Sequence, residues 1–354
     1  MAIKYIKNII FSQVEVTGIY RYKDEFQIYP INIENAPKSK NANHFPLIIE
    51  YQYNEENVKE IKAFDGKEDE SVNEMISKTS HQTNRLIEIT NLLSTISNFR
   101  FFFYRNVVMS WTIPIPEENN AENREEINNY SSNWSAQLYY YKNIVKDLQI
   151  TAFSTPEFKQ IELIPRIDYY WYEPMYGNKK EVDFPNNIDR VMEKYFALSA
   201  DEKKICNSSL HQFSNGLDLF KTMKSLSFFS FVSCIETLVN YEFRNDKVEF
   251  QCNDCKSIKS SSHTCNKCGK PIWGISAKFR EFLFKYVASS IDAKKLYNKI
   301  YTIRSQITHT GFLLSGDNFL DWDFTDKTEA LSTKHAEAMQ LCRRSVSNWL
   351  ILKE

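Results

Sequence analysis

Two patterns of hydrophobic and polar residues divide the chain. In the first, apolar and polar side chains alternate with a period of two, which is typical of a strand that buries one face. The clearest example is residues 44–53, where the apolar positions are Leu47, Ile49, Tyr51 and Tyr53. Similar aromatic alternation predicts three further strands, at residues 100–113, 135–142 and 164–173.

A helical pattern interrupts these strands. Residues 74–98 carry apolar side chains at helical spacing, namely Leu86, Ile89, Leu93 and Ile96. This spacing predicts an amphipathic helix that packs on the sheet. A later stretch containing Gly177, two lysines and Pro185 breaks the pattern. We therefore place a domain boundary after residue 180 and expect a strand-rich domain over residues 1–180.

The second pattern, over residues 181–354, is helical. Ser199, with Glu202 three residues later, is a capping-box signal that opens a helix. Residues 225–243 are apolar nearly all round except for one narrow polar stripe that includes Glu236, which predicts a core helix. Further helices are predicted at residues 278–287, 293–309 and 327–352. The expected fold class is α+β, with a strand-rich domain followed by an all-helical one.

Composition and charge narrow the functional classes. The chain has 354 residues, of which 42% are hydrophobic and 25% charged, so we expect packed cores and two domains. The net charge of −1 indicates that any surface for a polyanion must come from local clustering of basic residues. The N-terminal residues do not resemble a secretory signal, and the most apolar run, 228–239, is too short to cross a bilayer. We therefore expect a cytoplasmic protein.

Four of the seven cysteines form two C-x-x-C pairs separated by nine residues, and they are Cys252, Cys255, Cys265 and Cys268. Two such pairs complete the tetrahedral thiolate shell that Zn²⁺ prefers. We predict one structural zinc ribbon per chain, inserted in the helical domain at about residues 250–272; a redox role for one pair is the alternative. A closed shell leaves no position for water, so this zinc would not be catalytic. The remaining cysteines are expected to be buried thiols, at Cys206, Cys234 and Cys342.

Lysines surround the two cysteine pairs, at Lys256, Lys259, Lys267 and Lys270. Over residues 243–309, basic residues outnumber acidic ones, although the whole chain is almost neutral. This asymmetry favours a polyanionic partner such as RNA or DNA on this part of the surface. The alternative is that these lysines simply face solvent.

A second group of candidate residues lies in YTIRSQITHTG, residues 301–311. Arg304 lies beside the apolar stripe of the predicted helix, and His309 falls in its last turn before Gly311, which we expect to be the C-cap. Five residues rotate an ideal helix by about 500°, so these two side chains start roughly 140° apart. Only a loosened last turn or a partner molecule would bring both to one substrate. Arg and His near a helix C-terminus can also simply favour the helix dipole.

Taken with FVSCIETLVNYEF (231–243) and KFREFL (278–283), this R-x4-H stretch resembles the HEPN superfamily, in particular its ApeA-like group. The resemblance implies a metal-independent endoribonuclease of a bacterial antiphage-defence or toxin type, which dimerises so that two R-x4-H motifs face one another. It implies that Arg304 and His309 are the catalytic pair and that Glu236 supports them. Ser305 follows Arg304 where many active members carry Asn, Asp or His.

The residue types suit this chemistry. Cleaving RNA without a metal needs a base for the 2′-hydroxyl, an acid for the 5′-oxygen and a cation beside the phosphorane. A histidine can fill either proton-transfer role, and an arginine fork matches two phosphate oxygens. Two protomers related by a twofold axis would supply a base, an acid and two arginines, so the motif predicts a homodimer.

Two functional hypotheses follow. In the first, the protein is an endoribonuclease acting on RNA, and its N-terminal domain senses an unknown trigger, a phage protein or nucleic acid, or holds the nuclease inactive. In the second, the helical domain is catalytically silent and binds nucleic acid or protein through its ribbon and basic surface. For Glu236 three interpretations stand: catalytic support, orientation of Arg304, or a place on a polar stripe.

Overall fold

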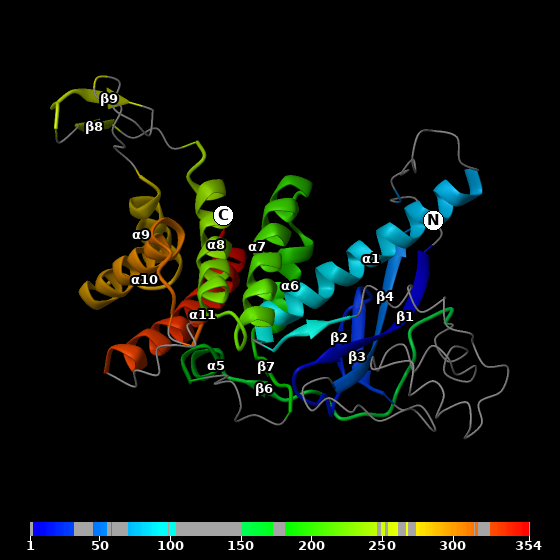
Figure 1. Cartoon of the computed structure of the whole chain (residues 1–354). Coiled ribbons are helices and arrows are strands. Elements are labelled where there is room, and N and C mark those ends of the chain that lie inside the picture. The colour runs from blue at the N-terminus through cyan, green and yellow to red at the C-terminus, as the bar shows by residue number, and fades with distance from the viewer. Residues whose placement is uncertain are drawn as a thin grey trace. The chain divides into compact units, whose positions relative to one another are not determined.

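The structure is a computed structural model (Figure 1). It describes residues 3–31, 45–54, 58, 70–97, 99–103, 150–172, 181–245, 249–251, 254–260, 267, 274–314, 316–317 and 326–353. The chain forms two compact units, residues 1–186 and 187–354. The first contains an antiparallel sheet and the second is mainly helical, which confirms the α+β class. The boundary expected after residue 180 falls at the end of a segment, residues 173–180, that lies outside the described residues.

A five-stranded antiparallel sheet, in the order β2-β3-β4-β1-β5, organises the first unit. Its strands are β1 (Ile3–Ser12), β2 (Tyr20–Tyr22), β3 (Phe26–Pro30), β4 (Phe45–Asn54) and β5 (Phe101–Phe102). The strand predicted at 44–53 is confirmed as β4, which pairs with β1 along its whole length. Of the strand predicted at 100–113, the structure describes residues 100–103, where β5 lies, and residues 135–142 are outside the described part.

The expectation that β4 buries only one face was wrong. Ile48 and Glu50 point to the opposite face from Leu47 and Ile49, yet all four are buried. Glu50 is buried because its carboxylate accepts hydrogen bonds from Gln27 Nε2 (2.7 Å), Tyr29 Oη (2.5 Å) and the Ser154 backbone N–H (2.8 Å). These donors replace water around the charge and fix the segment near Ser154 to the sheet.

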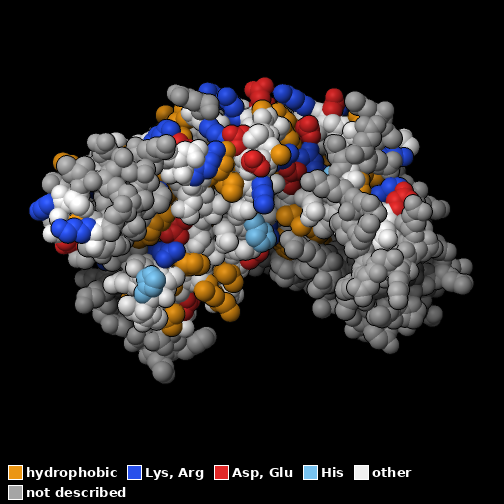
Figure 2. Space-filling view, turned by 90° about the horizontal axis from the view of Figure 1, so that it is seen from above, with side chains coloured by type: hydrophobic (Ala, Val, Ile, Leu, Met, Phe, Trp, Pro, Cys, Tyr) orange, Lys and Arg blue, Asp and Glu red, His pale blue; other side chains and the backbone are white. Residues whose placement is uncertain are grey.

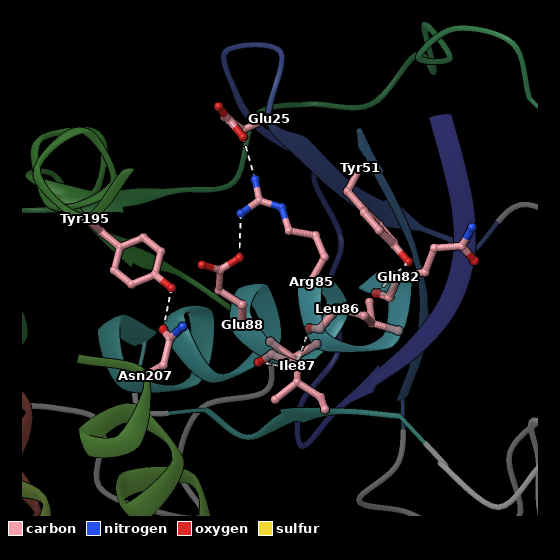
Figure 3. Close-up of polar contacts among 10 residues, drawn as sticks. Glu25, Tyr51, Gln82, Arg85, Leu86, Ile87, Glu88, Tyr195 and Asn207 are labelled. Atoms are coloured by element: carbon pink, nitrogen blue, oxygen red, sulfur yellow. Dashed lines mark hydrogen bonds and ion pairs between the residues drawn. The ribbon is translucent and has the colours of Figure 1, made fainter. Parts of the chain in front are cut away.

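Helix α1 (Glu70–Ser97) confirms the predicted amphipathic helix (Figure 1). Its expected apolar face is buried, at Leu86, Ile89, Leu93 and Ile96. Polar contacts fix the helix on the sheet: the Tyr51 hydroxyl donates to the Gln82 carbonyl (3.2 Å), and Arg85 bridges Glu25 and Glu88 (Figure 3).

The prediction of a strand at residues 164–173 was wrong. Only β6 (Leu163–Ile164) is extended, pairing in parallel with β7 (Phe184–Pro185), and helix α5 (Arg166–Tyr172) follows it. Pro165 precedes the helix, where its missing N–H costs nothing, and its carbonyl accepts from Tyr169 N–H (2.9 Å). Tyr169 and Tyr170 are adjacent and both buried, which a helix permits and a strand with one buried face does not. Packing overrides the strand preference of the aromatic residues here.

The second unit confirms the predicted helices. Its elements are α6 (Ile188–Phe196), α7 (Ala200–Leu219), α8 (Lys224–Glu242), α9 (Ile275–Tyr286), α10 (Ile291–Thr310) and α11 (Asp326–Leu352), with a two-stranded insertion, β8 (Glu249–Gln251) and β9 (Ile258–Ser260). Ser199 and Glu202 form the capping box at the start of α7. Helix α8 packs against α7, α9, α10 and α11, so it is the core helix that its sequence predicts.

His335, on α11, is a buried core residue of this unit. Its ring stacks on Phe220 with centroids 4.3 Å apart, and its Nε2 lies 2.8 Å from Ser227 Oγ. Because Ser227 Oγ donates its proton to the Gly216 carbonyl (2.7 Å), the His335 Nε2–H is the donor in the contact with Ser227. Burial, with a smaller effect from the charge of Lys224, lowers the pKa of His335 to about 4.

This shift predicts a pH-dependent stability. Between pH 6.5 and about pH 4 the unfolded chain protonates His335 and the folded chain does not, so the unfolding free energy should fall by about 3 kcal/mol as pH drops through that window. In His335→Gln, whose amide can still donate to Ser227, this part of the pH dependence should be absent. The measurement is the urea midpoint for loss of helical circular dichroism at several pH values. Parallel curves for the two proteins would contradict the assignment.

Candidate functional site

Helix α10 carries the Arg304 and His309 pair, and local sequence signals set its ends. The Ser290 side chain accepts from the Ala293 N–H (3.1 Å) at the N-terminus. At the C-terminus Gly311 has φ +70°, which confirms it as the left-handed C-cap that glycine favours. Ile300 and Ile303 are buried, while Leu296 and Ile307, the other expected members of the apolar stripe, are only half-buried.

Arg304 points towards α8. Its Nη2 lies 2.9 Å from Glu236 Oε2, and its guanidinium lies over the Phe229 ring, 5.2 Å from the centroid. Its Nη1 is 3.4 Å from Thr308 Oγ1 on the next turn of α10. The side chain is 20% exposed, so this ion pair is mostly removed from water but still reachable at one edge.

Glu236 lies at the centre of this cluster. Burial raises the pKa of its carboxyl, and the charge of Arg304 and a hydrogen bond with Tyr301 oppose that rise. Burial, and then the charge of Glu236, raises the pKa of the Tyr301 hydroxyl as well. Among the three interpretations of Glu236, the contact with Arg304 fits orientation of the arginine most directly.

His309 lies in a different place. It is exposed, and it lines a groove of about 430 Å³ between α9 and α10. Arg304 is not among the residues lining this groove. The helix geometry explains the separation, because residues five positions apart on α10 face about 140° apart. Within one chain, the structure therefore does not bring Arg304 and His309 together.

The groove is polar, and its described lining includes a cation, Arg280 on α9. Arg280 Nη1 donates to Asn298 Oδ1 (3.2 Å). Other lining residues are hydroxyl or amide side chains: Ser276, Asn298, Thr302, Ser305, Gln306 and Thr310. Tyr301 also lines the groove. Because its hydroxyl forms a hydrogen bond with Glu236, it connects the groove with the Arg304–Glu236 ion pair. Among the described residues, none that lines the groove carries a carboxylate.

Cys255, the described member of the first C-x-x-C pair, lies in the turn of a hairpin. Strands β8 and β9 pair from Glu249↔Ser260 to Gln251↔Ile258, and residues 254–257 are the described part of the connection between them. Cys255 is half-exposed, and the next residue, Lys256, has φ +57°, as a sharp turn after the cysteine requires.

The remaining three predicted zinc ligands, Cys252, Cys265 and Cys268, lie outside the described residues. No group of three metal-ligating side chains occurs within the described part, so the zinc site stays a prediction. The three other cysteines are buried as expected, at Cys206, Cys234 and Cys342.

The expected basic surface is described only in part. Lys256 and Lys267 are exposed, Lys259 lies on β9, and Lys270 is outside the described residues. On the face shown in Figure 2, Lys and Arg side chains are interspersed with Asp and Glu, so the described residues do not form one continuous basic patch there. None of the described helices has the length and hydropathy to cross a membrane.

Comparison with protein-family models, curated proteins and solved structures found no match. The resemblance to the HEPN superfamily therefore depends on the residues of the chain itself, namely the R-x4-H stretch and the two helical segments that precede it.

Sequence reasoning missed Arg280 and Tyr301. Tyr301 falls within the R-x4-H stretch and Arg280 within KFREFL, but neither segment shows which side chains share a groove. That depends on how α9 and α10 pack, which is a tertiary property. A usable signal was the i, i+4 relation of Tyr301, Ser305 and His309, which places all three on one side of α10.

Proposed function

We propose that the protein is a metal-independent endoribonuclease of the antiphage-defence or toxin type, with a HEPN-like helical domain carrying a zinc ribbon. The observation that carries this proposal is the exposure of His309 in a groove whose described lining is polar and has no carboxylate, on the same helix as an arginine held by a buried glutamate. A histidine accessible to substrate beside cationic and hydroxyl groups is the arrangement that metal-independent cleavage of a phosphodiester needs.

The residues take distinct roles in this reaction. His309 removes the proton from the 2′-hydroxyl or donates one to the leaving 5′-oxygen. Arg304 stabilises the negative charge of the phosphorane, and Glu236 keeps its guanidinium oriented. Ser305, one turn before His309 in the groove, is small and adds a hydroxyl where a larger polar residue would narrow the groove.

A homodimer completes the site. In one chain Arg304 faces α8 and His309 faces the α9–α10 groove, so a second copy is needed to place Arg304 beside a histidine and to supply the second histidine. A twofold axis near the C-terminus of α10 would supply both a base and an acid from identical residues. The N-terminal unit would then sense a trigger, a phage protein or nucleic acid, or hold the nuclease inactive.

The test of this function is incubation of the full chain with mixed tRNA and mRNA in excess EDTA. Wild type should cut the RNA, and His309→Ala should cut it at least about 100-fold more slowly, because it lacks the proton-transfer group. His211→Ala, which removes an exposed histidine on α7, is the matched control and should cut at the wild-type rate. Cleavage by His309→Ala at the wild-type rate would refute His309 as the catalytic residue. Cleavage that appears only with added Mg²⁺ would refute the metal-independent mechanism, because Mg²⁺ does not replace a structural zinc.

Zinc is proposed as a structural metal that folds the ribbon. The position of Cys255 in the turn between β8 and β9 supports this, because a turn between paired strands is where a C-x-x-C knuckle holds its metal. Elemental analysis of the purified chain should find one zinc per chain. Cys255→Ala should lose it, while Cys206→Ala, which alters a buried cysteine of α7, should keep it. Equal zinc in both variants would contradict the proposal.

The second candidate, a silent module that binds nucleic acid or protein, has the exposed Lys256 and Lys267 in its favour. It predicts RNA binding that is lost on removal of these lysines, together with intact RNA in every lane of the EDTA experiment. The two candidates thus predict different results. The nuclease cuts RNA and depends on His309, whereas the silent module binds RNA without cutting it and depends on Lys256 and Lys267.

A further inference from the structure

We propose that the groove between α9 and α10 binds an RNA phosphodiester and that Arg280 is the cation that holds it. This inference rests on the proposed function, since it specifies how the substrate reaches His309. It adds a substrate-binding residue from a helix outside the R-x4-H stretch.

The charge state of the two arginines is the first argument. Arg304 is paired with Glu236 at 2.9 Å, so it attracts a distant anion less than an arginine without a carboxylate partner, and its charge acts mainly on a group in direct contact with it. Arg280 has no carboxylate within ion-pair distance among the described residues, and its one hydrogen bond goes to the neutral amide oxygen of Asn298. Arg280 is therefore the arginine whose full charge acts on the groove.

The geometry of Arg280 is the second argument. The side chain is half-buried, and the bond from Nη1 to Asn298 joins α9 to α10 and fixes the plane of the guanidinium. Only one of its five N–H donors is used there, so the others remain for two phosphate oxygens. A guanidinium oriented before binding loses less entropy when it binds an anion.

The rest of the groove is the third argument. His309 and Thr310 lie at the C-terminal end of α10, where the helix dipole disfavours an anion, so a phosphate near His309 needs a compensating cation. Arg280 is the described arginine or lysine lining this groove, and hydroxyls such as Ser276 and Thr302 add neutral donors. A volume of about 430 Å³ is within the usual range of small-ligand sites and suits one nucleotide unit.

The experiment measures binding without cleavage. The full chain is titrated into a fluorescent single-stranded RNA carrying 2′-O-methyl groups, which cannot undergo transesterification, and anisotropy is recorded at several salt concentrations. Arg280→Gln should weaken binding about tenfold and reduce the salt slope by about 0.7, as expected for loss of one phosphate contact on a single strand. Arg280→Lys, which keeps the charge but not the fork, should recover part of the affinity.

Lys299→Gln is the matched control, because it removes one exposed positive charge from α10 outside the groove. It should change the dissociation constant less than about twofold. Wild-type affinity in Arg280→Gln, with unchanged circular dichroism, would overturn the inference. Equal losses in Arg280→Gln and Lys299→Gln would also overturn it, since they would show only a general effect of net charge.

A competition experiment distinguishes an RNA phosphodiester from free inorganic phosphate as the ligand of the groove. Unlabelled RNA of the same chemistry should displace the probe far below the concentration at which inorganic phosphate does. Displacement by inorganic phosphate at a similar concentration would make the groove a free-phosphate site and overturn the RNA assignment.

Failure of this inference and failure of the proposed function give different results. A chain that cuts RNA but binds it independently of Arg280 would refute the inference alone. A chain that binds RNA through Arg280 and never cuts it would refute the nuclease and leave the groove as an RNA-binding site.

Discussion

The contact between Arg304 and Glu236 is the constraint on which the site depends. Helix α8 packs against four other helices of its unit, so the position of Glu236 is fixed by the core. Arg304 on α10 pairs with this carboxylate, and helix geometry turns His309 towards the groove between α9 and α10. A buried ion pair adds little net stability, because desolvation offsets much of the attraction. We propose that this pair instead specifies one orientation of α10.

This arrangement divides the candidate chemistry between two sides of one helix. On one side, Arg304 is held by Glu236 and Phe229; on the other, His309 shares a groove with Arg280. Tyr301 contributes to both sides, since it forms a hydrogen bond with Glu236 and lines the groove. A change in the ionisation of Glu236 would therefore alter its hydrogen bond with Tyr301, whose side chain lines the groove. The separation also explains why a nuclease built on this helix would need two copies of the chain.

The sequence predicted those features that local physics determines. The capping box at Ser199, the C-cap at Gly311 and the apolar faces of α1 and α8 each depend on residues within a few turns of one another. The failures came from long-range packing. Residues 166–172 form a helix because tertiary burial of two adjacent tyrosines outweighs their strand preference, and Glu50 is buried because partners distant in the sequence satisfy it. For the same reason the candidate pair could be found from spacing, whereas its surroundings, including Arg280, could not.

The most direct test of the central claim concerns the 2′-hydroxyl of the substrate. A short RNA cut at a mapped position would be compared, in EDTA, with the same RNA carrying one 2′-deoxynucleotide on the 5′ side of that position. The account predicts that the all-ribose strand yields a 2′,3′-cyclic phosphate and a 5′-hydroxyl, and that the substituted strand stays intact there, because the attacking nucleophile is missing. Cleavage of the substituted strand at that position, or products that end in a 3′-hydroxyl and a 5′-phosphate, would contradict it.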